Sequence, residues 1–301
     1  MKRYFGARKD LYDGWDYLHV PVISPPALPP VVDMSDLYAP TMYQDSVNAC
    51  QGFAWDMNLC MWAKKLDVYR QPFSAMWLWN GARFEEGTLN QNVGVYTRDL
   101  LDWLLKKGSL LDDRWPFVGF QSVSPPSSLE PEAAKYRIKA YYRVDNGYEG
   151  ILSAMAMGYP VSVAIPWHPK WFRSPNNGRL PDLKVNDGTP QEFHAVTLGG
   201  YLLSDGLTMG INSWGPGWGK NGQFAFSLAM FDVFKYWGGY DAYYVLIVDA
   251  GWPIEPLPAP TPSPIQKGCR LGQAFMELAN RTSLPRALPG QTRGPRRPLW
   301  R

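Results

Sequence analysis

The sequence predicts an α+β protein in which a helical half precedes a β-rich half. Helical patterns fill the stretch before residue 121, whereas short apolar runs alternate with turn signals between residues 122 and 251. No internal repeat is visible. With 301 residues, 46% of them hydrophobic, the chain can bury one substantial core or two packed halves. We therefore expect two lobes with a cleft between them.

The chain divides into four regions. Residues 1–40 are predicted to form a Pro-rich N-terminal strap, because Pro25-Pro26 and Pro29-Pro30 favour extended backbone. Residues 41–121 form the helical lobe and residues 122–251 the β-rich lobe. Residues 252–301 are expected to be a Pro-rich, basic tail that is disordered, apart from a possible short helix over residues 271–280.

Three helices are predicted in the first lobe, over Ala49–Leu66, Ser74–Glu86 and Val95–Lys107. Each has apolar residues at helical spacing, which in the first helix fall along one side. Asn48 or Ser46 is a candidate cap for the start of the first helix. Gly108 is a stop signal for the third.

The second lobe reads as one helix and a series of strands. We predict a helix over Tyr148–Met157 and strands over Pro160–Ile165, His194–Leu203, Leu207–Asn212, Gln223–Phe226 and Tyr243–Val248. Ser204-Asp205-Gly206 is a turn signal, so the second and third strands form a hairpin. That hairpin brings His194 and Asn212 towards the same end of the sheet, and a bulge at Gly199-Gly200 could adjust its register.

Charge is unevenly distributed along the chain. The net charge is +3, yet from residue 251 onward eight basic residues face two acidic ones, so the tail carries about +6 and the body about −3. The net negative charge of the body therefore does not favour binding to nucleic acid. The tail leaves contact with nucleic acid or a membrane open, beside the simpler interpretation of a soluble disordered end.

The three cysteines do not predict a disulfide framework. On one helix Cys50 and Cys60 would lie about 15 Å apart, beyond disulfide reach, and Cys269 lies in the tail. This, together with the lack of an apolar leader or a membrane-spanning segment, favours a cytoplasmic monomer. No Cys or His pair has metal-ligand spacing, and no phosphate or dinucleotide fingerprint occurs, so neither a metal nor a cofactor is expected.

Four polar residues form a pattern suited to acyl transfer. Cys50 begins a predicted helix, where backbone N–H groups and the helix dipole are expected to lower its pKa. His194 can act as base and acid, and Asn212 can orient the imidazole. Gln44 and the backbone N–H of Cys50 can donate to a tetrahedral oxyanion. A thiol peptidase uses these residue types in this chain order.

Residues 28–249 resemble the papain-like cysteine peptidases. The resemblance rests on QDSVNACQGFA from Gln44, HAVTLGGY from His194 and NSWGPGWGKNGQF from Asn212. It implies a two-lobe fold with one helical and one β-barrel-like lobe, a Cys50 nucleophile on the central helix, and a peptide or protein substrate. Trp214 would shield the His–Asn hydrogen bond, and Trp218 would line the leaving-group side of the cleft.

The chain also departs from the familiar plant and lysosomal pattern. The usual disulfide cysteines are missing, Gln51 stands where Trp is common, and Asn92-Val93-Gly94 is only a weak match to the glycines that contact substrate. Because 49 residues precede Cys50, too few for the long inhibitory propeptide, the resemblance is to compact bacterial or viral members made without a zymogen stage.

Other interpretations stay open. A lone cysteine at a helix start is commonly a small buried hydrophobe, and His168 is expected to be a surface or packing histidine. The same chemistry could serve an amide hydrolase acting on cell-wall peptide. Alternatively, a catalytically silent papain-like domain could bind peptides or act as a structural component.

Overall fold

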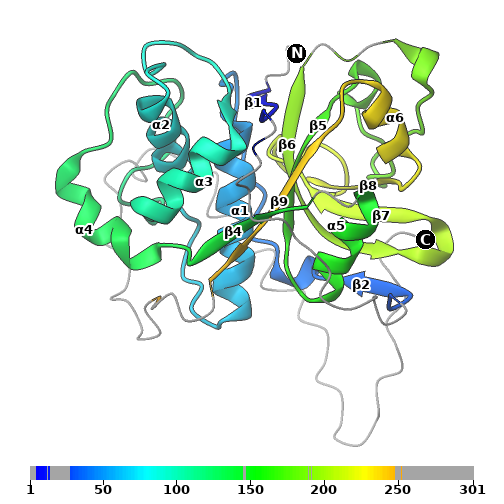
Figure 1. Ribbon diagram of the computed structural model, residues 1–301, viewed down its shortest axis with the longest axis horizontal. Coiled ribbons are helices and arrows are strands. Elements are labelled where there is room, and N and C mark those ends of the chain that lie inside the picture. The colour runs from blue at the N-terminus through cyan, green and yellow to red at the C-terminus, as the bar shows by residue number, and fades with distance from the viewer. Residues whose placement is uncertain are drawn as a thin grey trace, which may run out of the picture. The chain divides into compact units, whose positions relative to one another are not determined.

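The computed structural model describes residues 5–11, 13, 28–144, 147–188, 190, 192–247 and 252. Helices dominate the first part and strands the second, so the predicted α+β two-lobe class is confirmed (Figure 1). The predictions for the tail, including its short helix and Cys269, lie outside the described residues. Among the described residues, no helix has the length and apolar character needed to cross a lipid bilayer.

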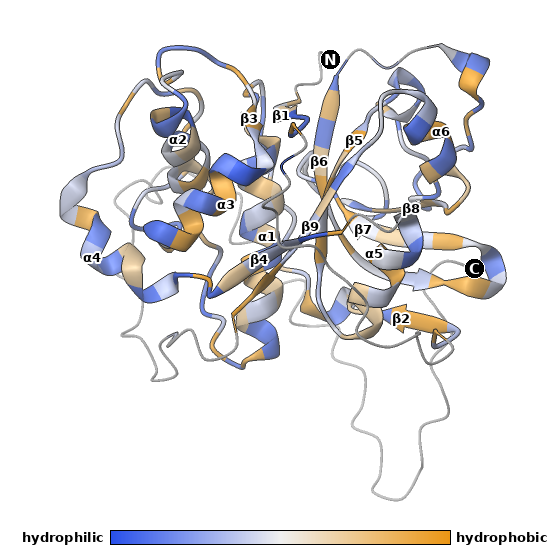
Figure 2. Ribbon diagram, viewed as in Figure 1, coloured by the Kyte–Doolittle hydropathy of each residue, from blue (hydrophilic) through white to orange (hydrophobic). Residues whose placement is uncertain are grey.

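The first lobe is built around one buried helix. Its helices are α1 (Cys50–Lys65), α2 (Ala75–Glu85) and α3 (Thr97–Lys106). Helix α4 (Glu130–Ala133) lies beside them, with Glu130 paired to Lys107, although its residues fall in the range predicted for the second lobe (Figure 1). Every residue of α1 from Cys50 to Ala63 is buried, because α2 packs on one side of the helix and strand β6 on another. The predicted single apolar side is therefore wrong for this helix, which is enclosed all round. In contrast, only part of α3 is buried, and this helix carries both hydrophobic and hydrophilic residues (Figure 2).

The starts of these helices differ in their capping. Ser74 caps α2, since its Oγ accepts the N–H of Trp77 at 2.9 Å. Ala49 stands at the N-cap of α1 and makes no side-chain bond to any described residue. The predicted caps are wrong because Asn48 is bonded elsewhere: its backbone N and side-chain Nδ2 donate to Asn92 Oδ1 (2.9 Å) and Asn92 O (2.7 Å).

The second lobe is a curved, mostly antiparallel sheet centred on the long strand β6. Its strands are β4 (Ala140–Arg143), β5 (Val161–Pro166), β6 (Phe193–Leu202), β7 (Leu207–Ile211), β8 (Gln223–Ser227) and β9 (Asp241–Leu246). Helices α5 (Gly147–Ala156) and α6 (Met230–Tyr236) belong to the same lobe. Strands β2 (Val31–Asp33), β5 and β7 all pair with β6. The predicted strands match this arrangement to within a few residues, whereas β4 and α6 were not anticipated.

The β6–β7 hairpin forms as its turn residues indicate. Gly206 adopts a left-handed conformation (φ 61°) that ends the turn. The register shifts between Leu198 and Gly200, which confirms the bulge expected there. Before the shift, Thr197 of β6 lies opposite Ile211, the last residue of β7.

Two short strands join the lobes. Strand β1 (Ala7–Arg8) runs parallel to β3 (Val95–Tyr96), and Ala7 also pairs antiparallel with Phe193 of β6. The third predicted helix therefore begins at Thr97, because Val95 and Tyr96 are used by β3. The sheet runs in the order β3-β1-β6-β5-β9-β4, so β1 lies between the two lobes.

Arg83 holds the loop between α2 and β3. Its buried Nη1 donates to Leu89 O (3.1 Å) and Gln91 O (2.7 Å), and Nη2 donates to Gln121 O (2.6 Å). The guanidinium also lies 3.7 Å from the centroid of the Trp79 ring. Arg83→Met would remove the donor to these three carbonyls and the contact with Trp79 at a fully buried side chain, so it should lower the free energy of unfolding by about 3 kcal/mol in urea titrations.

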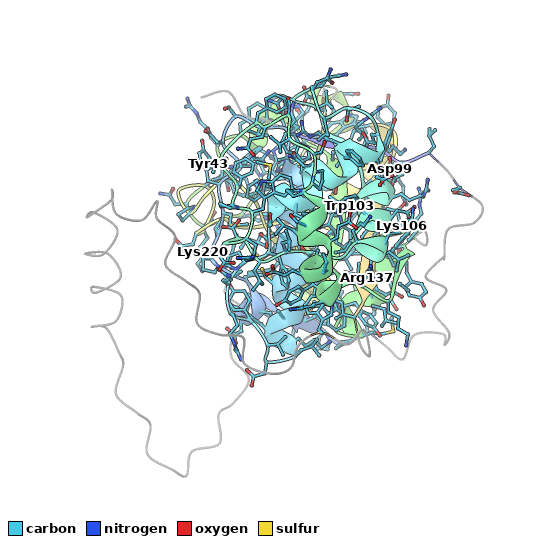
Figure 3. All side chains as sticks on the ribbon, turned by 90° about the vertical axis from the view of Figure 1, so that its left-hand side faces the viewer. Tyr43, Asp99, Trp103, Lys106, Arg137 and Lys220 are labelled. Carbon is cyan, nitrogen blue, oxygen red and sulfur yellow. The ribbon has the colours of Figure 1, made fainter. Side chains whose placement is uncertain are left out.

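Lys106 offers a matched control for that substitution. It lies on α3 near Asp99 and Trp103 (Figure 3), its side chain is 65% exposed, and it makes one i,i+4 ion pair with Asp102 at 3.3 Å. Lys106→Met should change stability by no more than about 0.5 kcal/mol. Equal effects of the two substitutions would show that the Arg83 contacts do not hold the loop.

Candidate active site

Cys50 is the first residue of α1 and is fully buried. Its Sγ accepts the backbone N–H of Ala195 at 3.2 Å. Cys50 therefore lies against the residue that follows His194 in β6. Ala54, Ala195 and Ala7 pack around it, and they come from α1, β6 and β1.

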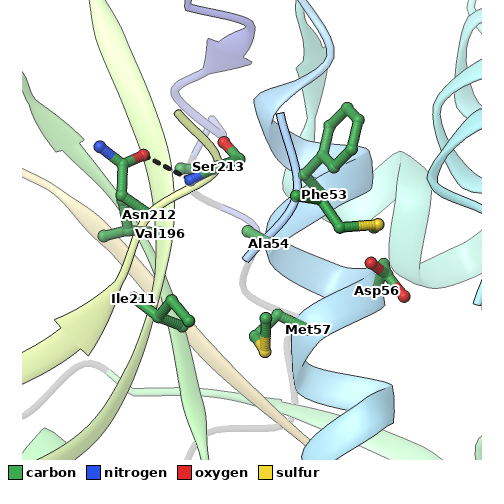
Figure 4. A pocket seen from close by; sticks show the side chains of 10 residues that line it. Phe53, Ala54, Asp56, Met57, Val196, Ile211, Asn212 and Ser213 are labelled. Carbon is green, nitrogen blue, oxygen red and sulfur yellow. Dashed lines mark hydrogen bonds between the residues drawn. The ribbon is translucent and has the colours of Figure 1, made fainter. Parts of the chain in front are cut away.

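His194 and Asn212 face each other from neighbouring strands. The Nε2–H of His194 donates to Asn212 Oδ1 at 2.7 Å, and the same oxygen accepts the backbone N–H of Ser213 at 2.7 Å (Figure 4). The imidazole is fully buried, with the rings of Trp214 and Trp167 at 4.7 and 4.8 Å between centroids. This aromatic wall keeps water away from the His–Asn hydrogen bond.

Gln44 is fixed by contacts at both ends of its amide. Its Oε1 accepts the hydroxyl of Ser213 at 2.6 Å. Its Nε2 donates to Val47 O (2.9 Å) and to Phe5 O (3.3 Å). Because carbonyl oxygens only accept, these two bonds settle which side of the amide carries the nitrogen. The carbonyl of Phe5 belongs to the N-terminal segment.

The two tryptophans of the Asn212 block occupy different positions. Trp214 contacts the imidazole directly. Trp218 is buried 5.5 Å from Trp214 by ring centroids, and its Nε1 donates to Trp171 O at 3.2 Å. A small pocket lies nearby, between α1 and the β6–β7 hairpin (Figure 4), and is lined by Met42, Phe53, Ala54, Asp56, Met57, Ala195, Val196, Ile211, Asn212 and Ser213.

Residues 5–8 lie between the two lobes, because β1 pairs with β3 and with β6. The Phe5 ring lies 5.8 Å from the His194 ring and 6.2 Å from Trp214. A Cβ on Gly6 would lie 2.0 Å from Asn48 O, and a Cβ on Gly94 would lie 2.5 Å from the Gly6 carbonyl carbon. Both positions therefore require glycine, and Gly94 contacts the backbone of residue 6.

The expected low pKa of Cys50 is not found in this arrangement. Burial raises the pKa of the Cys50 thiol to about 12, and this outweighs the opposing hydrogen bonds from the N–H groups of Ala195 and Gln51. The low pKa was predicted from the position of Cys50 at a helix N-terminus, without the burial of the sulfur beneath residues 5–8. With residues 5–8 in place, water does not reach the sulfur, so the neutral thiol is favoured.

Sequence reasoning missed three contributors to this site. Ser213 fixes the amide of Gln44, Trp167 packs on the imidazole, and Phe5 covers it. Ser213 was within a recognised motif and could have been found there. Trp167 and Phe5 lie 27 and 189 residues from His194 along the chain, and no local pattern marks them. In the described residues no cluster of three His, Cys, Asp or Glu side chains could hold a metal ion.

Comparisons with known proteins agree with this geometry. The family described as "Papain family cysteine protease" matches residues 89–231, which include His194 and Asn212. The fold resembles that of xylellain, a cysteine protease from Xylella fastidiosa, with a TM-score of 0.72, 22% identity, and coverage of 82% of this chain and 98% of that one. Over residues 89–231, just under half of its length, the chain is similar to the papain family of cysteine proteases.

Other papain-like relatives are more distant or match in part. Papaya proteinase 4 of Carica papaya is 30% identical over 129 residues, and a cysteine protease of Blomia tropicalis is 26% identical over 132. Each match covers 42% of this chain, but only 35% and 38% of the relatives. Digestive procathepsin L 3 of Tenebrio molitor shares the fold with a TM-score of 0.60 and 15% identity, over 77% of this chain and 74% of that chain.

Proposed function

We propose that the chain is a thiol peptidase that hydrolyses peptide bonds through a thioester intermediate. The observation that carries the proposal is the Cys50–Ala195 contact beside the His194–Asn212 hydrogen bond, which gathers residues from α1, β6 and the end of β7. A sulfur nucleophile and an imidazole oriented by an amide are the groups that acyl transfer needs. Peptides or proteins are the proposed substrates.

In the proposed reaction the Cys50 sulfur attacks the substrate carbonyl carbon after its proton passes to His194. The C–S bond forms, the carbonyl becomes an oxyanion, and Gln44 Nε2 with the Cys50 backbone N–H stabilises that charge. Collapse breaks the C–N bond, and the amine leaves with the proton from His194. Water then attacks the thioester while His194 takes its proton, which releases the acid and restores the thiol.

Asn212 and Trp214 act on the imidazole. The Asn212 oxygen accepts the Nε2–H of His194, so the other ring nitrogen is the one available to exchange a proton with Cys50. Trp214 excludes water from this bond. These roles follow from the hydrogen-bond pattern together with the family resemblance.

The proposal is tested by labelling with a thiol-reactive, peptide-like epoxide at mildly acidic pH. The substitution Gly6→Val is introduced first, because a side chain at residue 6 cannot fit beneath Asn48 O and residues 5–8 must then leave the site. The Gly6→Val protein is called the opened chain below. Fast, single labelling at Cys50 that His194→Ala abolishes would support a thiolate–imidazolium pair. Labelling at Cys50 no faster than at buried Cys60, and indifferent to His194, would refute it.

A papain-like domain that binds peptides without cleaving them is the second candidate. The covered, protonated Cys50 thiol favours it, since a sulfur with a pKa of about 12 is a poor nucleophile near neutral pH. An assay of the Gly6→Val protein distinguishes the peptidase from the peptide-binding domain. Turnover after Gly6→Val supports the peptidase, whereas tight peptide binding with no turnover supports the binding domain.

Ser213 positions the oxyanion donor, so its removal should have a modest, specific effect. Ser213→Ala deletes the 2.6 Å hydrogen bond to Gln44 Oε1 and leaves the amide less well fixed. We expect kcat of the opened chain to fall about fivefold with KM unchanged, the equivalent of about 1 kcal/mol. Steady-state kinetics measures this, and a change confined to KM would place Ser213 in substrate binding instead.

A further inference from the structure

One side chain of the N-terminal segment is held in a specific site at the edge of the cleft. Arg8 Nη1 lies 3.0 Å from Glu86 Oε2, and Arg8 Nη2 donates to Tyr96 Oη at 2.9 Å. The Arg8 guanidinium carbon also lies 4.0 Å from the centroid of the Tyr96 ring. A carboxylate, a phenol and an aromatic face therefore surround one planar cation.

The receptor half of this site is built into the helical lobe. The Glu86 side chain is 6% exposed, whereas that of Arg8 is 41% exposed. Glu86 follows the last residue of α2, and its Oε1 accepts the backbone N–H of Tyr96 at 2.9 Å. The carboxylate is thus fixed by main chain before any cation arrives, unlike an ordinary surface ion pair between two mobile side chains.

Burial makes this carboxylate dependent on a cation. Burial, with the charge of Asp99 on the first turn of α3, raises the pKa of Glu86 to about 7, while the backbone N–H of Tyr96 and the charge of Arg8 lower it. An ionised carboxyl so placed is stabilised chiefly by a positive partner. The geometry and the charge agree on a site for a guanidinium.

The site belongs to the same cleft as Cys50. Arg8 pairs with Tyr96 in the β1–β3 register, and its neighbour Ala7 packs against the Cys50 cluster. Two residues before Arg8, Gly6 lies beneath Asn48 O. A peptide that takes the place of residues 5–8 would pass Glu86 and Tyr96.

We propose that Glu86 and Tyr96 form a subsite that recognises an arginine side chain of a peptide bound in the cleft, and that Arg8 fills it in cis. This inference rests on the proposed function for its substrate class: peptides with arginine near the cleaved bond. The planar fork and the ring stacking favour arginine over lysine, whose ammonium is a point charge. The segment of residues 5–10 is thereby a built-in occupant of the subsite.

Binding tests the subsite without relying on catalysis. The full-length chain carries Gly6→Val and Arg8→Ala to empty the cleft, and Cys50→Ala to prevent turnover. Calorimetry then compares the peptide FGARKD, which copies residues 5–10, with the same peptide carrying citrulline for arginine. Citrulline keeps the shape and removes the charge. We expect the arginine peptide to bind about 10- to 100-fold more tightly, the range of a charge-assisted hydrogen bond.

Two further variants assign that difference to its residues. Glu86→Gln should reduce the ratio of the affinities for the arginine and citrulline peptides to near one, and Tyr96→Phe should reduce this ratio in part. Glu85→Gln is the matched control, since it removes the exposed carboxylate next to Glu86 and should leave the ratio unchanged. Thermal unfolding of each variant shows that the chain is folded.

The outcomes separate this inference from the proposed function. Equal affinity for the two peptides, absence of binding, or a ratio unaffected by Glu86→Gln would overturn the subsite. A chain with intact Cys50 that prefers the arginine peptide but cleaves no peptide would keep the subsite and lose the peptidase function. Substrates with arginine at each position in turn complete the test. Turnover of these substrates without any preference for arginine would keep the peptidase function and overturn the subsite.

Discussion

Replacing Cys50 by alanine is expected to abolish peptide hydrolysis, with turnover reduced at least about 10⁴-fold in the chain opened by Gly6→Val. The sulfur is the group that forms the covalent bond, and no neighbouring residue can replace it in that step. The fold should survive. The lost Sγ leaves the N–H of Ala195 without its acceptor, which costs about 1 to 2 kcal/mol.

Cys60 provides the control for this experiment. It is also buried on α1, ten residues further on, and its thiol donates to Asp56 Oδ1 at 3.2 Å. Cys60→Ala should leave turnover within about twofold of the parent, because that residue lies away from the imidazole. Turnover is followed with a fluorogenic peptide and folding by circular dichroism. Undiminished hydrolysis by Cys50→Ala would remove Cys50 from the reaction.

Opening the cleft with Gly6→Val is expected to raise the rate of Cys50 labelling and of turnover at least about tenfold. In the closed arrangement Gly6 has a φ of 142°, and a Cβ there would lie 2.0 Å from Asn48 O and 2.2 Å from its carbonyl carbon. Valine cannot occupy this position, so residues 5–8 must leave. Their departure frees the amide of Gln44 from Phe5 O and lets water and substrate reach the sulfur.

The pH dependence of labelling gives a second measure of the same opening. In the covered chain burial raises the thiol pKa to about 12, so the thiolate fraction grows about tenfold per pH unit through the neutral range. Wild-type labelling should therefore climb steadily up to high pH. In the Gly6→Val chain the rate should level off at lower pH, because the rehydrated sulfur ionises more easily.

Leu11→Ala is the control for the substitution in the segment. Leu11 is 77% exposed, so its truncation should leave the segment in place and the rates unchanged. Identical labelling of wild type and Gly6→Val at every pH would show that residues 5–8 do not limit access to Cys50.

Much of the fold could be predicted because its signals are local. The turn at Ser204-Asp205-Gly206 and the apolar runs on either side specify the β6–β7 hairpin, and with it the approach of His194 to Asn212. Motif spacing likewise singled out Cys50 and Gln44. The start of α3 could not be placed, because Val95 and Tyr96 have helical spacing but pair with strand β1 from the N-terminal segment.

The features that sequence could not supply are those set by distant contacts. Strand β1 has two residues and no alternating pattern, so nothing local predicts that it enters the cleft. The burial that raises the Cys50 pKa depends on that strand and was missed with it. Glu86 was predicted only as the end of a helix, and the fold places it against Arg8 and the backbone of Tyr96.

The alanine at the start of α1 has a consequence for how this helix is stabilised. A Ser, Thr, Asp or Asn at that position would bind the first free amides of the helix and add about 1 kcal/mol of stability. Ala49 leaves those amides directed at the cleft, where Cys50 and Gln51 contribute them to the sulfur. The helix is instead held by enclosure, with its neighbours fixing its position. The chain thus leaves a source of local rigidity unused at the one turn where its polar groups are needed for chemistry.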